Sequence, residues 1–178
     1  MNTANKLTMV RVLLIPVFIV ILYLNFEHYR YVALGVYILA TLTDLADGFV
    51  ARSRNQITDF GKFMDPLADK VLSFAALLWF IEVGLIPAWL VLIVVLREFM
   101  VTGMRLVASA KGRVVAAGVS GKIKTLTVNL CIMAMFLPLY DWGIGWLLYV
   151  CWVLIGVTTV VSGIEYLVKN RDMMKLDM

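Results

Sequence analysis

Six long apolar runs constrain this chain more than any other feature. Hydrophobic residues make up 62% of its 178 residues and charged residues only 16%, which is far too apolar for a soluble domain of this length. Most runs approach the roughly 20 residues that a membrane-spanning helix needs, and their continuous hydrophobicity favours helices over a barrel. We therefore expect an all-α integral membrane protein that forms a single domain over residues 1–178. The expected transmembrane helices cover about residues 10–24, 31–52, 62–83, 87–108, 119–137 and 144–168, after a short interfacial lead-in at 5–11.

Lys and Arg lie mostly on one side of these six helices. The connectors at 25–30, 83–87 and 138–143 carry one basic residue, Arg30, whereas the other side carries thirteen in its connectors, the chain ends and the adjoining helix ends. The positive-inside rule then places both termini in the cytoplasm of a multi-pass cell-membrane protein. The net charge of +4 therefore reflects topology and does not imply a nucleic-acid partner. Four tryptophans fall near the expected outer ends, where interfacial anchors belong: Trp79, Trp89, Trp142 and Trp146.

One stretch, residues 44–69, gathers four carboxylates within this apolar chain. Asp44 and Asp47 are three residues apart on the second expected helix, and Asp65 and Asp69 are four apart on the third. Such spacings place each pair on one helix face, and the short link makes the two helices antiparallel neighbours. Converging carboxylates in a low dielectric need cations, and all-oxygen ligand sets suit Mg²⁺ or Mn²⁺. Four carboxylates suffice for a two-metal site acting on a displacement at phosphorus, although acidic pairs at helical spacing also occur on solvated faces.

Small and basic residues accompany the four aspartates. Gly48 and Ala51 lie one and two turns beyond Asp44 on roughly the same face and leave room for a bulky group. Gly61 opens the approach to the third helix, where free backbone N–H groups favour an anion. Three roles stay open for Arg52, which could contact a diphosphate, pair with an aspartate or anchor the helix at the interface.

The pattern of residues 44–69 resembles the signature of the CDP-alcohol phosphotransferase family, D-x-x-D-G-x-x-A-R-(x8)-G-x-x-x-D-x-x-x-D, at every fixed position. That resemblance implies transfer of a substituted phosphate group from a CDP-linked donor to an alcohol, with release of CMP. It also implies that Asp69 is the general base and that the protein is a homodimer, as members of the family often are. The implied ligands of two divalent cations are Asp44, Asp47, Asp65 and Asp69, and the implied CDP-site residues are Gly48, Ala51, Arg52 and Gly61.

A basic block between residues 97 and 124 is a candidate site for an acceptor that carries its own phosphate. Arg97 falls within an apolar run and needs a partner, but the adjacent Glu98 is not expected to share its helix face. The loop cations could instead set topology or bind anionic lipid headgroups. The five candidates for acceptor binding are Arg97, Arg105, Arg113, Lys122 and Lys124.

Together with residues 5–16, this block resembles the phosphatidylglycerophosphate synthase branch of the family, which uses CDP-diacylglycerol and glycerol 3-phosphate. The implied reaction is attack of the acceptor's free primary hydroxyl on the β-phosphorus of the donor, at a site that faces the cytoplasm. The donor's acyl chains would remain in the lipid bilayer during the reaction. Serine, inositol phosphate or phosphatidylglycerol remain alternative acceptors.

Two points remain: an alternative function as a transporter, and the state of the two cysteines. A divalent-cation transporter would also use intramembrane aspartates, but the acids cluster at one membrane face without a polar path beyond them. Cys131 and Cys151 lie in apolar runs and are expected as small buried hydrophobes, with a disulfide or a metal pair as the alternative.

Overall fold

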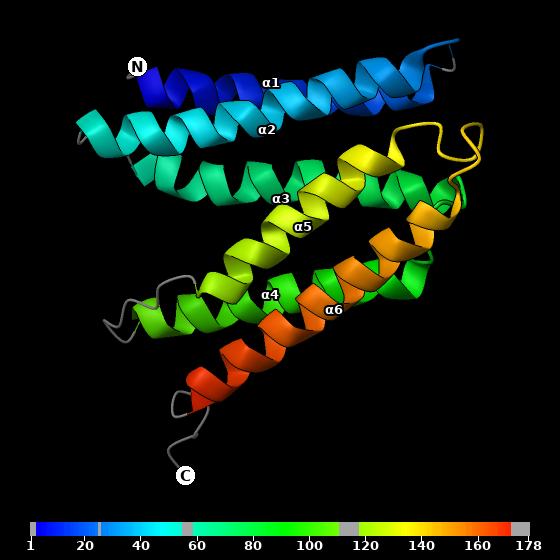
Figure 1. Cartoon of the computed structure of the whole chain (residues 1–178). Helices are drawn as coiled ribbons and strands as arrows, with labels where there is room; N and C mark the ends of the chain where they lie inside the picture. The colour runs from blue at the N-terminus through cyan, green and yellow to red at the C-terminus, as the bar shows by residue number, and fades with distance from the viewer. Residues whose placement is uncertain (1–2, 25, 55–58, 111–117, 172–178) are drawn as a thin grey trace. The chain divides into compact units, whose positions relative to one another are not determined.

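The computed structural model describes residues 3–24, 26–54, 59–110 and 118–171, which form helices joined by turns and short irregular segments. Side chains are described at 9, 10, 12–24, 26–43, 70–109 and 118–171. No strand occurs within these ranges, so the expected all-α class is confirmed. Their six helices, in chain order, are α1 (Thr3–Tyr23), α2 (Tyr29–Arg54), α3 (Asp59–Glu82), α4 (Ala88–Ala110), α5 (Val119–Met135) and α6 (Trp146–Lys169) (Figure 1).

The helix boundaries agree with the expected ones to within three residues except at the start of α1. Residues 5–11 were expected as an interfacial lead-in, but α1 already begins at Thr3 and continues through them. Pro16 lies inside this helix without ending it. The connectors that join the helices are correspondingly short, as the positions of the apolar runs predict.

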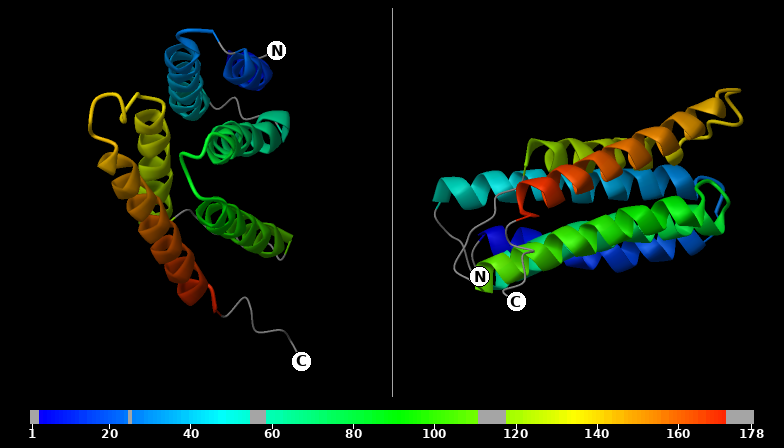
Figure 2. Two further views of the ribbon diagram at one scale, coloured as in Figure 1. Left: turned by 90° about the vertical axis from the view of Figure 1, so that its right-hand side faces the viewer. Right: turned by 90° about the horizontal axis from the view of Figure 1, so that it is seen from below.

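The chain divides into two compact units, which are described separately. The first unit comprises Met1–Trp79 and Ile132–Pro138, and the second comprises Phe80–Cys131 and Leu139–Met178. Within the first unit, α1 packs along α2, and the blue and cyan helices lie side by side in each view of Figure 2. Within the second unit, α4 packs against α6.

An aromatic cluster forms the core of the first unit. The Phe136 ring meets Phe18 edge-on at 5.9 Å and stacks on Trp79 at 5.9 Å, and Tyr37 packs against Phe18. Trp79 is only 5% exposed, so its prediction as an interfacial anchor was wrong: the ring packs in this aromatic core instead of facing a membrane boundary. The other three predicted anchors are exposed: Trp89, Trp142 and Trp146.

A tight turn in the second unit ends α3 and leads into α4. Gly84 takes a positive φ of 74°, which L-residues with a Cβ rarely adopt. Its N–H donates to Ile81 O at 3.1 Å and the Leu85 N–H donates to Phe80 O at 2.8 Å, which is a Schellman ending. The indole of Trp152 on α6 donates to Leu85 O at 2.9 Å and ties this turn to α6.

One of the described helices has the length and composition to span a membrane. Within the described ranges, α6 alone is long and apolar enough by itself to cross a membrane. In α4, Arg97, Glu98 and Arg105 fall within any 18 consecutive residues of the helix, which lowers its apolar character. The six-span topology therefore stays a prediction.

Cys131 and Cys151 are both buried and free, so they are small buried side chains and form no disulfide.

Candidate functional site

The aspartate motif lies on helical backbone in α2 and α3. Asp44 and Asp47 fall in the second half of α2, and Asp65 and Asp69 fall in the first half of α3. Helical spacing therefore places each pair on one face of its helix, as expected. The side chains of these four residues lie outside the described ones, so their convergence and metal binding stay predictions. The same holds for the predicted CDP-site residues Gly48, Ala51, Arg52 and Gly61.

The start of α3 differs from its expected position in a way that bears on this motif. Asp59 was expected in a connector but is the first residue of α3, three residues before the expected start. Gly61 thus lies in the first turn, where backbone N–H groups have no acceptor within the helix. Such N–H groups are available to an anion, which agrees with the role expected for Gly61.

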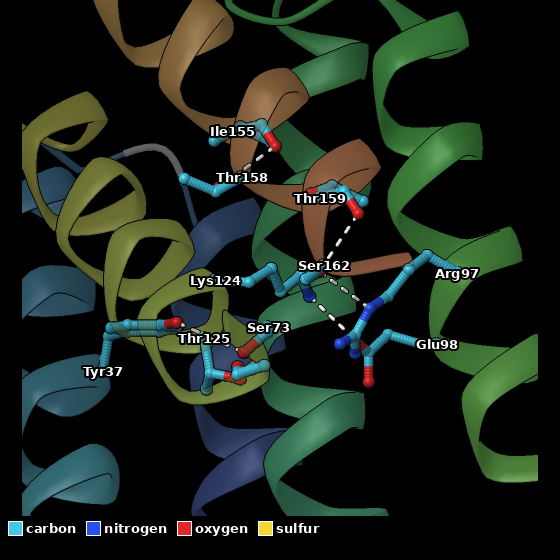
Figure 3. A network of polar contacts seen from close by, with 11 residues as sticks. Tyr37, Ser73, Arg97, Glu98, Lys124, Thr125, Ile155, Thr158, Thr159 and Ser162 are labelled. Atoms are coloured by element: carbon cyan, nitrogen blue, oxygen red, sulfur yellow. Dashed lines mark hydrogen bonds and ion pairs between the residues drawn. The ribbon is translucent and has the colours of Figure 1, made fainter. Parts of the chain in front are cut away.

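A buried ionic network connects α4, α5 and α6 in the second unit (Figure 3). The Arg97 guanidinium donates from Nε to Ser162 Oγ at 3.1 Å and from Nη1 to Glu98 Oε1 at 2.8 Å. Lys124 Nζ donates to the same Glu98 oxygen at 2.8 Å. Glu98 was not expected to share the helix face of Arg97, yet the long Arg97 side chain reaches its neighbour's carboxylate. All three charged side chains are at most 13% exposed, so one carboxylate compensates two buried cations.

Two glycines give the Arg97 side chain its space. A Cβ at Gly121 on α5 would lie 3.2 Å from Arg97 Nη2, which is tighter than an ordinary contact. A Cβ at Gly163 on α6 would lie 3.4 Å from Arg97 Cγ. Both helices therefore approach the guanidinium closely, and this approach holds it at the edge of a cavity.

A cavity of about 140 Å³ lies beside this network, entirely within the second unit. Its walls come from α4, the start of α5 and the C-terminal half of α6. The lining residues are Arg97, Arg105, Gly118, Ser120, Gly121, Ser162, Glu165, Tyr166, Lys169 and Asn170.

Among the described residues that line the cavity, two carry a buried polar atom without a hydrogen-bond partner. These atoms are Arg105 Nε and the Tyr166 hydroxyl. The Arg105 guanidinium lies over the Tyr166 ring, 5.8 Å from its centroid, so the two side chains are adjacent. Leaving a buried donor unsatisfied costs on the order of 1–3 kcal/mol, so native proteins seldom keep two together without a reason.

The five predicted acceptor residues are placed differently from one another. Arg97 and Arg105 both line the cavity, so the structure brings these two together. Lys122 is exposed on α5 and does not line it, and Lys124 is buried against Glu98. Arg113 lies outside the described residues.

The polar face of α6 was missed by the sequence reasoning. Thr159, Ser162, Tyr166 and Lys169 follow one another at spacings of three, four and three residues. That spacing is typical of one helix face. A search for polar periodicity within the sixth apolar run would have found this face, whereas its high overall hydrophobicity concealed it.

Comparison with known proteins gives consistent matches. Residues 1–161 match the family described as CDP-alcohol phosphatidyltransferase. The chain is 40% identical to the CDP-diacylglycerol–glycerol-3-phosphate 3-phosphatidyltransferase of Bacillus subtilis, over 98% of this chain and 97% of the relative. It is 34% identical to the probable phosphatidylglycerophosphate synthase of Mycobacterium tuberculosis, over 94% of this chain and 81% of the relative. A Rickettsia felis protein with the same name as the Bacillus relative is 30% identical over 93% of each chain.

Proposed function

The chain belongs to the CDP-alcohol phosphatidyltransferase family, and we propose that it transfers the phosphatidyl group of CDP-diacylglycerol to glycerol 3-phosphate. The products are phosphatidylglycerophosphate and CMP. One observation supports this proposal above the others. A relative named for this reaction aligns with 98% of the chain at 40% identity. The protein is then a membrane enzyme of phospholipid biosynthesis.

The donor half of the reaction is assigned to the aspartate motif. Asp44, Asp47, Asp65 and Asp69 would hold two divalent cations, Mg²⁺ or Mn²⁺, because a set of carboxylate oxygens fits hard cations of this kind. The pairing of the aspartates on helical faces of α2 and α3 supports this fit. When bound, the cations would neutralise charge on the diphosphate and on the departing CMP. The CDP site would be completed by Gly48, Ala51, Arg52 and Gly61.

The chemical step is a single displacement at the donor's β-phosphorus. Asp69 accepts the proton of the free primary hydroxyl of glycerol 3-phosphate, and the hydroxyl oxygen forms the new bond to phosphorus. The bond between that phosphorus and the CMP oxygen breaks, and CMP leaves with its electron pair. A positioned carboxylate base contributes typically 10²–10⁴-fold to such a step.

The acceptor half is assigned to the basic block. Arg97 and Arg105 bind the phosphate of glycerol 3-phosphate, and their shared place on the wall of one cavity supports this role. Lys124 acts through Glu98, with which it is paired, and so holds Arg97 in position. Arg113 and Lys122 contribute long-range attraction for the anionic acceptor.

We also propose that all six helices cross the cell membrane with both termini and the active site at the cytoplasmic face. At about 1.5 Å per residue, α2, α3, α4 and α6 each extend roughly 35–39 Å, enough for a hydrocarbon core of about 30 Å. Large exposed apolar side chains on α1, α4 and α6 support contact with lipid, since a soluble monomer rarely exposes so many together. A homodimer, as the family resemblance implies, completes the proposal.

An acceptor panel tests the function. Purified protein with Mg²⁺ and CDP-diacylglycerol should release CMP with glycerol 3-phosphate, and the lipid product should have the mass of phosphatidylglycerophosphate. Serine, inositol phosphate and phosphatidylglycerol serve as competing acceptors in parallel reactions. CMP release with one of these alone would reassign the acceptor, and no CMP with any alcohol would refute the enzyme.

A further inference from the structure

We propose that the Tyr166 hydroxyl and the first turn of α5 bind the phosphate monoester of the acceptor in the 140 Å³ cavity. This inference rests on the proposed function for the identity of the acceptor. It assigns to Tyr166 a role in acceptor specificity that the sequence did not indicate. Four observations support it: an unsatisfied hydroxyl, a helix start, the charge of the wall and the size of the cavity.

The Tyr166 hydroxyl is a candidate partner for a ligand. Tyr166 is 8% exposed and lines the cavity, and its buried hydroxyl has no hydrogen-bond partner among the described residues. Arg105 Nε is unsatisfied in the same wall, and the Arg105 guanidinium lies against the Tyr166 ring. Both groups are donors, so an acceptor-rich anion between them would satisfy both at once.

The start of α5 adds donors of the same kind. The backbone N–H groups of Val119, Ser120 and Gly121 belong to the first turn and have no acceptor within the helix. Ser120 and Gly121 line the cavity. A helix N-terminus favours negative charge, and its N–H groups suit phosphate oxygens.

The charge of the cavity wall matches a phosphate monoester. Arg97, Arg105 and Lys169 supply three positive charges, and Glu165 supplies one negative charge. Glu165 is itself paired with Lys169. A phosphate monoester carries about −1.5 to −2 charges at neutral pH, so it would balance the two arginines. A phosphodiester such as a lipid headgroup carries less charge and offers fewer free oxygens.

The cavity has room for a small anion. Its volume of about 140 Å³ is several times what a single water molecule needs. That space suits a phosphate group with a short carbon chain.

Calorimetry on the purified full-length protein tests binding without turnover. Glycerol 3-phosphate, inorganic phosphate and glycerol are titrated separately, in detergent and without CDP-diacylglycerol, and glycerol 3-phosphate is titrated again with phosphatidylglycerol present. We expect the wild type to bind the first two and not glycerol, and we expect phosphatidylglycerol not to compete. Tyr166→Phe should weaken the binding of glycerol 3-phosphate roughly ten- to hundredfold, the worth of one hydrogen bond to a charged group. The inference is overturned by absent wild-type binding, by displacement with phosphatidylglycerol, or by equal affinity of the variant.

Two controls separate this role from a structural one. Tyr149→Phe makes the same change at an exposed position on the same helix and should leave the affinity unchanged. Because the Tyr166 hydroxyl has no hydrogen-bond partner within the part of the chain that the structure describes, Tyr166→Phe should keep or raise the melting temperature. A clear loss of melting temperature in this variant would contradict the inference by assigning the hydroxyl to folding.

Kinetics then separate this inference from the proposed function. With CMP release as the readout, Tyr166→Phe should raise the KM for glycerol 3-phosphate and leave the KM for CDP-diacylglycerol unchanged. Equal increases in both would overturn the acceptor role. Binding of glycerol 3-phosphate without any CMP release would instead refute the proposed function and leave the phosphate site standing.

Discussion

The substitution Glu98→Gln tests the buried network that holds Arg97. Glu98 Oε1 accepts from Arg97 Nη1 and from Lys124 Nζ, each at 2.8 Å, and its side chain is 13% exposed. Glutamine keeps the size and the carbonyl oxygen but removes the negative charge. The change therefore leaves two buried cations without this shared counter-charge.

The magnitude follows from these distances. At 2.8 Å and an effective dielectric of about 20, each contact supplies about 6 kcal/mol of direct attraction, before the cost of removing the ions from water. Removing one partner of a buried pair costs about 3–5 kcal/mol in measured cases. Because glutamine can still accept one hydrogen bond, we expect a loss of about 3 kcal/mol in the free energy of unfolding.

Equilibrium unfolding of the detergent-solubilised protein measures this loss. A double-mutant cycle with Lys124→Met should return a coupling energy of about 2 kcal/mol or more, as close charge pairs do. Glu165→Gln is the matched control, since its ion pair with Lys169 spans one helical turn at the surface and should contribute far less to the free energy of unfolding. A loss below about 1 kcal/mol for Glu98→Gln, or additive effects with Lys124→Met, would refute the shared-carboxylate reasoning.

Three further predictions follow from the site and the fold. Asp69→Asn should lower kcat by about 10²–10⁴-fold with the melting temperature retained, whereas Asp59→Asn on the same helix should leave CMP release near the wild-type rate; wild-type turnover in Asp69→Asn would remove the base assignment. Arg105→Ala should raise the KM for glycerol 3-phosphate at least about tenfold and spare that for CDP-diacylglycerol, and an unchanged acceptor KM would make Arg105 structural. Gly84→Ala should cost about 1–2 kcal/mol of stability because φ is 74°, and Gly35→Ala, where a Cβ meets nothing within 4 Å, is the control; equal stability of the two would contradict the strain argument.

Helix positions were largely predictable because apolar runs and charged connectors mark them directly. The motif between Asp44 and Asp69 was also visible in the sequence, since fixed spacing on helices determines which residues share a face. The extension of α1 to Thr3 was not visible, because polar residues near a membrane surface are compatible with either a helix or a coil.

Packing was much less predictable than helix positions. On α1, Phe18 is fully buried while Leu13 is 64% exposed, although both are apolar. Lipid is as apolar as a protein core, so hydropathy cannot separate the two environments. The same ambiguity explains why Trp79 was expected at a boundary and lies in the aromatic core.

Polar contacts inside the second unit could not be read from spacing at all. Arg97 and Glu98 point in different directions on an ideal helix, yet the flexible arginine side chain closes the gap. Lys124 belonged to a basic connector in the sequence, but its partner on α4 makes it a buried network residue. The length of the side chain and the packing of the helices decide such contacts. The spacing of residues along the sequence reveals neither of them.

An isotope-labelling experiment tests the central claim most directly. Glycerol 3-phosphate carrying ¹⁸O in its free primary hydroxyl is incubated with the protein, Mg²⁺ and CDP-diacylglycerol, and both products are analysed by mass spectrometry. Direct transfer of the phosphatidyl group predicts that phosphatidylglycerophosphate retains the ¹⁸O and that CMP contains none. Unlabelled phosphatidylglycerophosphate, labelled CMP or the absence of both products would contradict the account.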